Sequence, residues 1–258
     1  MVAVGDVQRR NALEFLLNEL YVRRFYDHPR RVPNAIAGSK VNLRRSGDST
    51  LDQFIQRSAG AIDQKHRSGL GIERLDVPEA IVLFDGASTD AWTGGHVDER
   101  GLLAAGTKSK RGFTNFTLHV EFLLPFKPLG RGQDRGNSGV YLQDRYEVQV
   151  LDSFGLKGDN SECGAIYSKL KPDVNMCFPP LIWQTYDIEF TAAQFDADGT
   201  KTKNAVATVK HNGVTIHDHA EISGPTGGGA PETPQGGPIQ LQGHGSPVFY
   251  RNIWVVEK

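Results

Sequence analysis

The chain has 258 residues, of which 38% are hydrophobic, and its formal net charge is −1. A nearly neutral chain has no overall field to attract nucleic acid, and no run of 18 or more apolar residues is present that could form a transmembrane segment. The first residues lack the basic stretch and apolar segment of an export signal, so no signal peptide is visible. With 29 Gly and 13 Pro, turns are frequent, which favours many short strands.

Residues 1–76 differ from the rest and form the first expected domain. They carry 13 Lys and Arg against 9 Asp and Glu, whereas the remainder is acidic. Apolar spacing predicts a helix over residues 9–27 and a second over residues 49–66. The basic patches are not interleaved with aromatic residues, which argues against nucleic acid as a partner. We expect a helical N-terminal extension, either packed on the main domain or used as an arm for a protein partner or an oligomer.

From residue 77 the pattern changes to strands, which defines a second expected domain, residues 77–258. The expected strands lie at 81–84, 101–105, 113–124, two within 136–152, 165–167, 183–191, 205–210, 214–217, 238–244 and 247–256. Asn212-Gly213 is typical of a hairpin turn. No helix is expected between these strands. The sequence therefore predicts a mainly β fold, an antiparallel β-sandwich or jelly roll with a helical N-terminal extension.

Two strands joined by a short polar turn occupy residues 136–152. In the second strand, Val148 and Val150 alternate with Glu147 and Gln149, so the carboxylate and the amide should face away from the core. Asp152 is out of phase and joins them only if a bulge precedes it. The spacing Glu-x-Gln-x-x-Asp is similar to the Glu-x-Asp-x-x-Glu strand of laminarinase-type glycosidases, in which paired carboxylates do the chemistry. The alternative is a half-exposed strand whose polar face meets water.

Three expected strands carry polar side chains opposite their apolar ones. If these strands share one sheet face, they form a groove of carboxylates, amides and imidazoles that suits the hydroxyl groups of a sugar. The residues are His119, Glu121, Glu147, Gln149, Gln240, Gln242 and His244. No Gly-x-Ser-x-Gly, phosphate loop or dinucleotide fingerprint is present, so serine-hydrolase, kinase and nicotinamide chemistry have no support.

The two cysteines, Cys163 and Cys177, are not at zinc-finger spacing, so a structural zinc is not expected. They could form a disulfide in an oxidising compartment, or remain two buried free thiols.

The order of the motifs resembles the 3-keto-disaccharide hydrolase family, long described as a domain of unknown function. The motifs that carry the resemblance are Phe84-Asp85-Gly86 with Trp92, Phe116 to Phe122, Asn137 to Tyr141, Tyr146 to Asp152, Cys163 to Tyr167, Trp183 to Asp187, His211-Asn212-Gly213, Gly237 to His244 and Phe249 to Ile253. The match covers residues 80–257 and leaves residues 1–76 outside. It implies a concanavalin-like jelly roll of the lectin and glucanase type. The family is usually exported, so localisation stays open.

The resemblance also implies action on 3-keto-glucosides, by hydrolysis or by lyase and hydratase steps. A ketone at C3 acidifies the proton on C2; a base removes it, the enolate expels the C1 substituent, and water can then add. We expect Glu147 to be the base, with His244 and Arg251 stabilising the enolate oxygen. The other expected sugar-contacting residues are Glu121, Asn137, Tyr141, Gln149, Asp152, Trp183 and Gln242.

A divalent metal ion is also an expectation, since Glu147, Asp152 and His244 could supply oxygen and nitrogen ligands, but their spacing specifies no metal. Two other functions fit the same fold. One is a non-catalytic carbohydrate-binding module, and the other is an assembly subunit that docks through the N-terminal arm.

Overall fold

The computed structural model describes residues 79–258, so the expected helices and the expected domain over residues 1–76 lie outside the described residues. Within residues 79–258 the chain forms fourteen strands and one short 3-10 helix, η2 (Gly132–Asp134). No helix in this part of the chain has the length and apolar character needed to cross a membrane.

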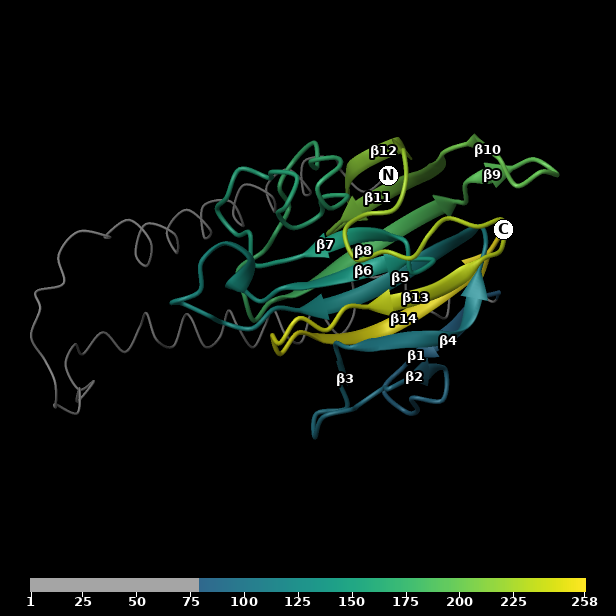
Figure 1. The fold of residues 1–258 in the computed structure, drawn as a ribbon. Coiled ribbons are helices and arrows are strands. Elements are labelled where there is room, and N and C mark those ends of the chain that lie inside the picture. Colours follow the sequence, from purple (N-terminus) through teal and green to yellow (C-terminus); the bar gives the residue numbers. More distant parts are fainter. Residues whose placement is uncertain (1–78) are drawn as a thin grey trace, which may run out of the picture. The chain divides into compact units, whose positions relative to one another are not determined.

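Seven strands form the larger sheet, and all their pairings are antiparallel. In spatial order they are β1 (Ile81–Phe84), β14 (Phe249–Glu257), β5 (Phe116–Leu123), β8 (Trp183–Thr191), β11 (Ala205–His211) and β12 (Val214–Ile222), with β3 (Leu103–Ala104) pairing with β14. The last strand, β14, lies between β1 and β5 in this sheet (Figure 1).

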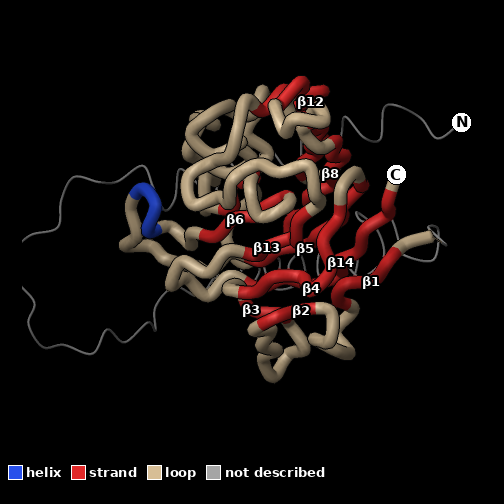
Figure 2. Tube along the Cα trace, turned by 45° about the vertical axis from the view of Figure 1, so that its right-hand side comes forward, coloured by secondary structure: helices blue, strands red, loops and turns tan. Residues whose placement is uncertain are grey.

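Five strands form the smaller sheet, which is also antiparallel. Their order is β2 (Trp92–Thr93), β4 (Thr107–Phe113), β13 (Gly237–Leu241), β6 (Ser138–Leu142) and β7 (Tyr146–Val150). A separate hairpin pairs β9 (Gln194–Phe195) with β10 (Lys201–Lys203). Long loops follow β7 and β12. Figure 2 draws the loops of the described residues in tan beside the red strands.

The core lies between the two sheets, and three contacts cross it. The rings of Tyr146 and Phe190 have centroids 5.5 Å apart. Ser138 Oγ lies 2.7 Å from the hydroxyl of Tyr250, and the Tyr186 hydroxyl donates to the main-chain oxygen of Gln149 at 2.6 Å. Because side chains alternate along a strand, the residues between these inward ones point away from the core, on the outer face of each sheet.

The predicted antiparallel β-sandwich is confirmed, with local corrections to the strands. The expected strand at 113–124 corresponds to β5, which begins at Phe116, while Phe113 ends a separate strand, β4, before a bend at residues 114 and 115. β4 was not predicted because its Lys and Arg residues obscure the buried Thr107, Ser109 and Phe113. The hairpin of β9 and β10 was also missed, and the expected strand at 238–244 ends at Leu241.

Candidate functional site

The outer face of the five-stranded sheet carries the strongest candidate site, which we call the Glu147 face. It is defined by the residues that alternate with the core residues of β6, β7 and β13: Gly139, Tyr141, Glu147, Gln149, Gln240 and Gln242. β6 and β7 pair in unbroken register from Ser138 opposite Val150 to Leu142 opposite Tyr146. That register sets Tyr141 beside Glu147, and the turn at Gln143 and Asp144, with positive φ at both residues, holds the two strands together.

Glu147 lies over a position that has no side chain. A Cβ on Gly139 would come within 2.2 Å of Glu147 Oε1, so only glycine leaves room for this carboxyl group. Glycine inside a strand weakens the strand and commonly marks a close approach of this kind. Glu147 itself is 3% exposed. Its Oε1 has no hydrogen-bond partner within residues 79–258, whereas Oε2 is bonded to Tyr141.

Tyr141 determines where the proton of this cluster lies. Its hydroxyl oxygen is 2.6 Å from the main-chain oxygen of Gly227 and 2.9 Å from Glu147 Oε2. The hydroxyl has one proton and faces two oxygens, so it donates either to Gly227 O or to Glu147 Oε2. Both contacts can be hydrogen bonds at once only when Glu147 is protonated and donates to Tyr141 while Tyr141 donates to Gly227.

The environment of Glu147 favours the same protonation state. Burial raises the pKa of Glu147 to about 7, and the hydrogen bond with Tyr141 offsets only part of that rise. A carboxyl group with a pKa near neutrality can be a base in its ionised fraction and an acid in the remainder. This is the range in which a general acid–base residue is most effective at physiological pH.

A glycine-rich loop, residues 223–236, packs against this cluster. Thr226 Oγ1 accepts the main-chain N–H of Glu147 at 2.9 Å, and Gly227 is the carbonyl partner of Tyr141. Arg145 anchors the loop through Pro231 O at 3.0 Å and Thr233 Oγ1 at 2.6 Å. The loop therefore positions a catalytic candidate through its main chain, which makes Gly227 a participant that sequence patterns do not reveal.

The outer face of the seven-stranded sheet carries a second polar cluster, the Arg251 face. It is defined by His119, Glu121, Trp183, Thr185, Asp187, Arg251, Asn252 and Trp254. Arg251 Nε donates to Glu121 Oε2 at 2.6 Å, and its guanidinium stacks on the ring of Trp183, 3.9 Å from the centroid. The condition for a single groove, that all three polar strands share one sheet face, is not met, because β5 belongs to the other sheet from β7 and β13.

This placement separates three predicted site residues from Glu147. Arg251 was expected to stabilise the enolate, and Glu121 and Trp183 to contact the sugar beside Glu147. The structure places all three across the core from Glu147, and the indole face of Trp183 is occupied by the guanidinium of Arg251. Alternation along one strand predicts which residues share a face of that strand, but it does not tell to which sheet the strand belongs.

The charged groups of the Arg251 face neutralise one another. His119 Nδ1 lies 2.6 Å from Asp187 Oδ1 and its ring stacks on Trp254. Burial lowers the pKa of His119, but hydrogen bonds with Asp187 and Glu121 outweigh it and raise the pKa to about 9. Burial works to raise the pKa of Glu121, but its contacts with His119, Arg251 and Asn252 lower it to about 2. At neutral pH His119 is thus held as a cation and Glu121 as an anion, as in a structural ion-pair network.

A family model described as the 3-keto-alpha-glucoside-1,2-lyase-like domain matches residues 79–256. The chain belongs to this family. A crystal structure of a candidate glycosyl hydrolase from Parabacteroides distasonis is similar to it, with 36% identity and a TM-score of 0.64, covering 70% of this chain and 84% of that one. A second candidate glycosyl hydrolase from the same organism, at 18% identity and a TM-score of 0.51, covers 73% of this chain and 98% of that one and shares the fold. No curated protein matches this chain.

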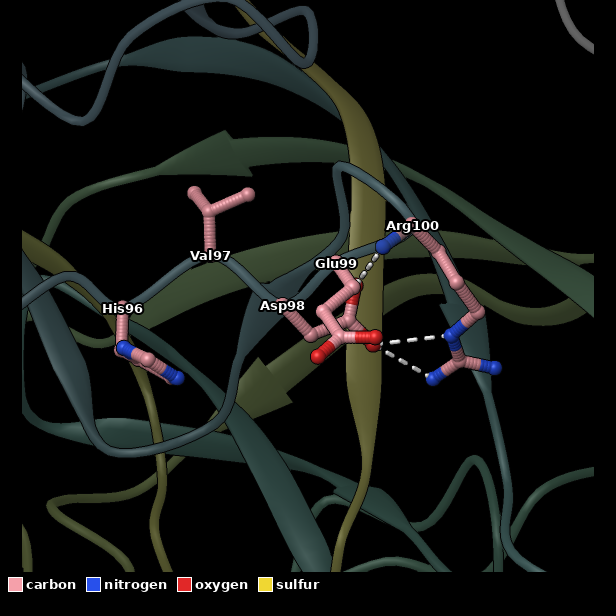
Figure 3. Close-up of a pocket in the computed structure, with 5 residues that line it drawn as sticks. All are labelled: His96, Val97, Asp98, Glu99 and Arg100. Carbon is pink, nitrogen blue, oxygen red and sulfur yellow. Dashed lines mark hydrogen bonds and ion pairs between the residues drawn. The ribbon is translucent and has the colours of Figure 1, made fainter.

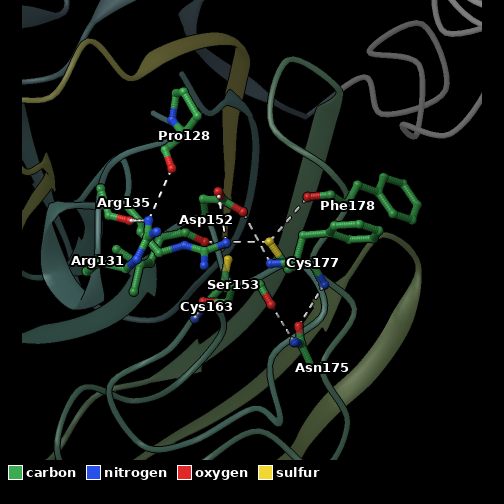
Figure 4. A network of polar contacts seen from close by, with 12 residues as sticks. Pro128, Arg131, Arg135, Asp152, Ser153, Cys163, Asn175, Cys177 and Phe178 are labelled. Atoms are coloured by element: carbon green, nitrogen blue, oxygen red, sulfur yellow. Dashed lines mark hydrogen bonds and ion pairs between the residues drawn. The ribbon is translucent and has the colours of Figure 1, made fainter. Parts of the chain in front are cut away.

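Asp152 does not join Glu147 on the face of this 3-keto-glucoside-lyase-like domain. No bulge interrupts β7, and the Asp152 carboxylate lies 3.1 Å from the Arg135 guanidinium (Figure 4). Burial raises the pKa of Asp152, and Arg135 opposes that rise. Within residues 79–258 no three His, Cys, Asp or Glu side chains are grouped as metal ligands, so Glu147, Asp152 and His244 do not form a ready-made set. Cys163 and Cys177 are buried free thiols.

The remaining predicted residues lie on the Glu147 face or at its border. His244 is exposed in the turn two residues beyond Gln242, whose Nε2 is 3.2 Å from the Tyr141 hydroxyl. Gln149 and Asn137 both donate to Gln133 Oε1, at 2.9 and 3.1 Å. Gln133, on η2, was missed because a glutamine in a loop of Gly, Arg and Pro carries no periodic signal.

An open hollow of about 520 Å³ lies elsewhere, along the loop of His96, Val97, Asp98, Glu99 and Arg100 (Figure 3). The Asp98 carboxylate accepts the main-chain N–H groups of Arg100 and Leu102 and pairs with the Arg100 side chain. The hydrogen bonds of the Asp98 carboxylate therefore stabilise the loop in which Asp98 itself lies. The loop follows β2, at the edge of the five-stranded sheet opposite β7, so we place the site at Glu147 and not here.

Proposed function

We propose that the protein cleaves 3-keto-glucosides by β-elimination on the Glu147 face, with hydration of the product completing a net hydrolysis. The observation that carries this proposal is the state of Glu147: a buried carboxyl group with a pKa near 7, one oxygen bonded to Tyr141 and the other open above Gly139. Membership of the 3-keto-alpha-glucoside-1,2-lyase-like family and the similarity to glycosyl hydrolase candidates support the same substrate class.

Glu147 can move one proton through the whole elimination. The ionised carboxylate takes the C2 proton of the 3-keto sugar, and the C2–H electron pair forms the enolate. Because this site favours the neutral carboxyl group, accepting the proton is favourable. The enolate then re-forms the ketone as the C1–O bond breaks, and the leaving oxygen takes the proton from Glu147. Water adds to the resulting C1=C2 bond to give the free 3-keto sugar.

The enolate oxygen needs a donor, and His244 is the predicted residue that remains on this side of the protein. We propose that the exposed imidazole of His244 donates to the C3 oxygen when substrate is bound, in the role first expected to be shared with Arg251. A divalent metal ion at the same oxygen would serve the same purpose, so its requirement belongs in the test.

The test is to incubate the protein with a 3-keto-glucoside and with its unoxidised parent in deuterated water, with divalent metal and after chelation, and to measure aglycone release. We expect release from the keto compound alone, with deuterium at C2 of the product. Release from both sugars at equal rates would contradict the enolate route. Binding of sugar without release would replace the enzyme by a carbohydrate-binding module.

A further inference from the structure

Two oxygen atoms on the Glu147 face are buried without a hydrogen-bond partner among residues 79–258: Asn137 Oδ1 and Gln242 Oε1. Asn137 is only 4% exposed, and a buried acceptor left unpaired costs free energy. Such atoms are rare in folded proteins and call for a particular explanation. Here the explanation follows from which atoms of each amide are already in use.

The orientation of the Asn137 amide is forced by a chain of contacts that ends at a carbonyl. Gln133 lies 2.9 Å from the main-chain oxygen of Ser161, which can only accept, so Nε2 of Gln133 points there and Oε1 points back. That Oε1 then accepts from Gln149 and from Asn137, and the atom of Asn137 that faces it must be Nδ2. Exchanging the nitrogen and oxygen of Asn137 would place two acceptors against each other, so Oδ1 is the atom left over.

The orientation of Gln242 is forced in the same way through Tyr141. The hydroxyl proton of Tyr141 is used by Gly227 O at 2.6 Å or Glu147 Oε2 at 2.9 Å, so the amide of Gln242 at 3.2 Å must donate to the hydroxyl oxygen. Nε2 of Gln242 therefore faces Tyr141, and Oε1 is the atom that remains free.

Both free oxygens flank the same point of the sheet. The main-chain N–H of Gln242 donates to Gly139 O at 2.8 Å, so the two residues are neighbours on adjacent strands. Asn137 precedes Gly139 by two residues, which puts it diagonally across from Gln242 at about 7–8 Å between Cα atoms. Glu147 lies over Gly139 from the other side. The two acceptors and the reactive carboxyl group thus surround one residue that has no side chain.

We propose that Asn137 Oδ1 and Gln242 Oε1 accept hydrogen bonds from two hydroxyl groups of one sugar, and so fix its orientation over Gly139. The inference rests on the proposed function, and it adds a rule of specificity. A ketone cannot donate, so the oxidised carbon cannot face either amide oxygen. The two amides select the hydroxyl-bearing edge of the ring and leave the keto edge for other donors.

The experiment compares Asn137→Leu and Gln242→Leu with Asn175→Leu as a matched control. Asn175 is an amide with both ends in use: Nδ2 donates to Ser153 O and Leu156 O, and Oδ1 accepts from Cys177 N (Figure 4). Thermal melting tests whether Asn137 Oδ1 lacks a hydrogen-bond partner in the ligand-free protein. Asn175→Leu should lower Tm by about 2–4 °C per bond lost. Asn137→Leu loses one bond, from Nδ2 to Gln133, but also removes a buried unpaired acceptor, so its Tm should fall by no more than the loss of one bond would cause.

Binding is then measured with a 3-keto-glucoside, its unoxidised parent, and analogues of the parent in which one hydroxyl at a time is replaced by fluorine, which cannot donate. We expect Asn137→Leu and Gln242→Leu each to weaken binding of the parent sugar about tenfold. For each variant, one fluoro analogue should bind wild type about tenfold more weakly than the parent does, and should bind the matching variant as well as the parent does. Asn175→Leu should bind every analogue as wild type does.

Three outcomes would overturn the inference while leaving the proposed function standing. In the first, Asn137→Leu is destabilised as much as Asn175→Leu, so its oxygen was already paired. In the second, Tm behaves as expected but binding and turnover of the keto substrate are unchanged, so the oxygen holds only water. In the third, no fluoro analogue matches either variant. If wild type neither turns over nor binds any of these sugars, the proposed function falls and the inference falls with it.

Discussion

The two outer faces of the sandwich carry similar residues and treat them in opposite ways. Each has a buried glutamate, Glu147 on one and Glu121 on the other, 3% and 9% exposed. Glu121 is bonded to a guanidinium and an amide, and these contacts hold its pKa near 2. Glu147 has one neutral partner and no cation, and burial raises its pKa to about 7. The difference shows that pairing, more than burial, decides whether a carboxyl group is structural or reactive.

The same contrast extends to the neighbouring side chains. On the Arg251 face the charged atoms find partners within the protein, and the buried atoms without a partner among residues 79–258 are neutral, Thr185 Oγ1 and Trp254 Nε1. On the Glu147 face one carboxyl oxygen and two amide oxygens lack partners in the same part of the chain. The unmet capacity of the Glu147 face thus includes a carboxyl oxygen, which can accept a proton as well as a hydrogen bond.

The largest expected effect comes from changing the two glutamates in the same way. Glu147→Gln keeps the shape of the side chain but cannot take a proton, so kcat on a 3-keto-glucoside should fall by about 10²–10⁴-fold. Glu121→Gln should leave the turnover of folded protein within about twofold, because Glu121 is across the core from the site. Steady-state kinetics on both variants checks this.

The cost of Glu121→Gln should appear in stability instead. It leaves Arg251 without its anionic partner, and the free energy of unfolding should fall by about 2 kcal/mol. If Glu121→Gln abolished turnover in protein that remains folded, the assignment of chemistry to only one face would be wrong.

The second prediction sharpens the contrast through pH. The folded pKa of Glu147, about 7, lies above the ordinary value of 4.5, so the folded state resists ionisation. Below pH 4.5 the carboxyl group is neutral in both states and costs nothing, and the penalty grows as the pH rises to 7 and is complete above it. Glu147→Gln should therefore be more stable than wild type at pH 8, by up to about 3 kcal/mol, and equal to it at pH 4.

Glu121 should show the opposite dependence, which provides the internal control. Its folded pKa, about 2, lies below 4.5, so its stabilising contribution is present above pH 4.5 and is lost as the pH falls towards 2. Glu121→Gln should thus be less stable than wild type at pH 7, and the deficit should shrink in acid. Denaturant unfolding at pH 4 and pH 8 checks both variants, and equal pH profiles for the two would refute the contrast.

The sequence predicted the sandwich and the local face of nearly every site residue, because a period of two is a local property of each strand. It placed Glu147 and Gln149, and likewise His119 and Glu121, opposite the apolar side chains of their own strands, and both placements hold. It could not predict that these faces lie on opposite sides of the core, since sheet membership depends on pairings between residues far apart in the chain, such as Glu121 with Arg251, which are 130 positions apart. The partner of Tyr141 was equally hidden, because a main-chain oxygen leaves no mark on composition.

One feature of the site that the sequence shows without revealing its reason is Gly139, the second residue of β6. Glycine there has a strand conformation that any residue can adopt, so its reason is space and not backbone geometry. In Gly139→Ala, the new Cβ would clash with Oε1, Cδ and Cγ of Glu147, so the Glu147 side chain would have to move. The carboxyl group would leave its position, and misplacement of a catalytic group by about 1 Å can lower the rate 10²-fold, so we expect kcat to fall by about 10–100-fold.

Gly224→Ala is the control, because nothing lies within 4 Å of its added Cβ and its activity should match wild type. Full activity in Gly139→Ala would mean that the position of Glu147 above this glycine is irrelevant to turnover, and the catalytic assignment would have to move elsewhere on the face.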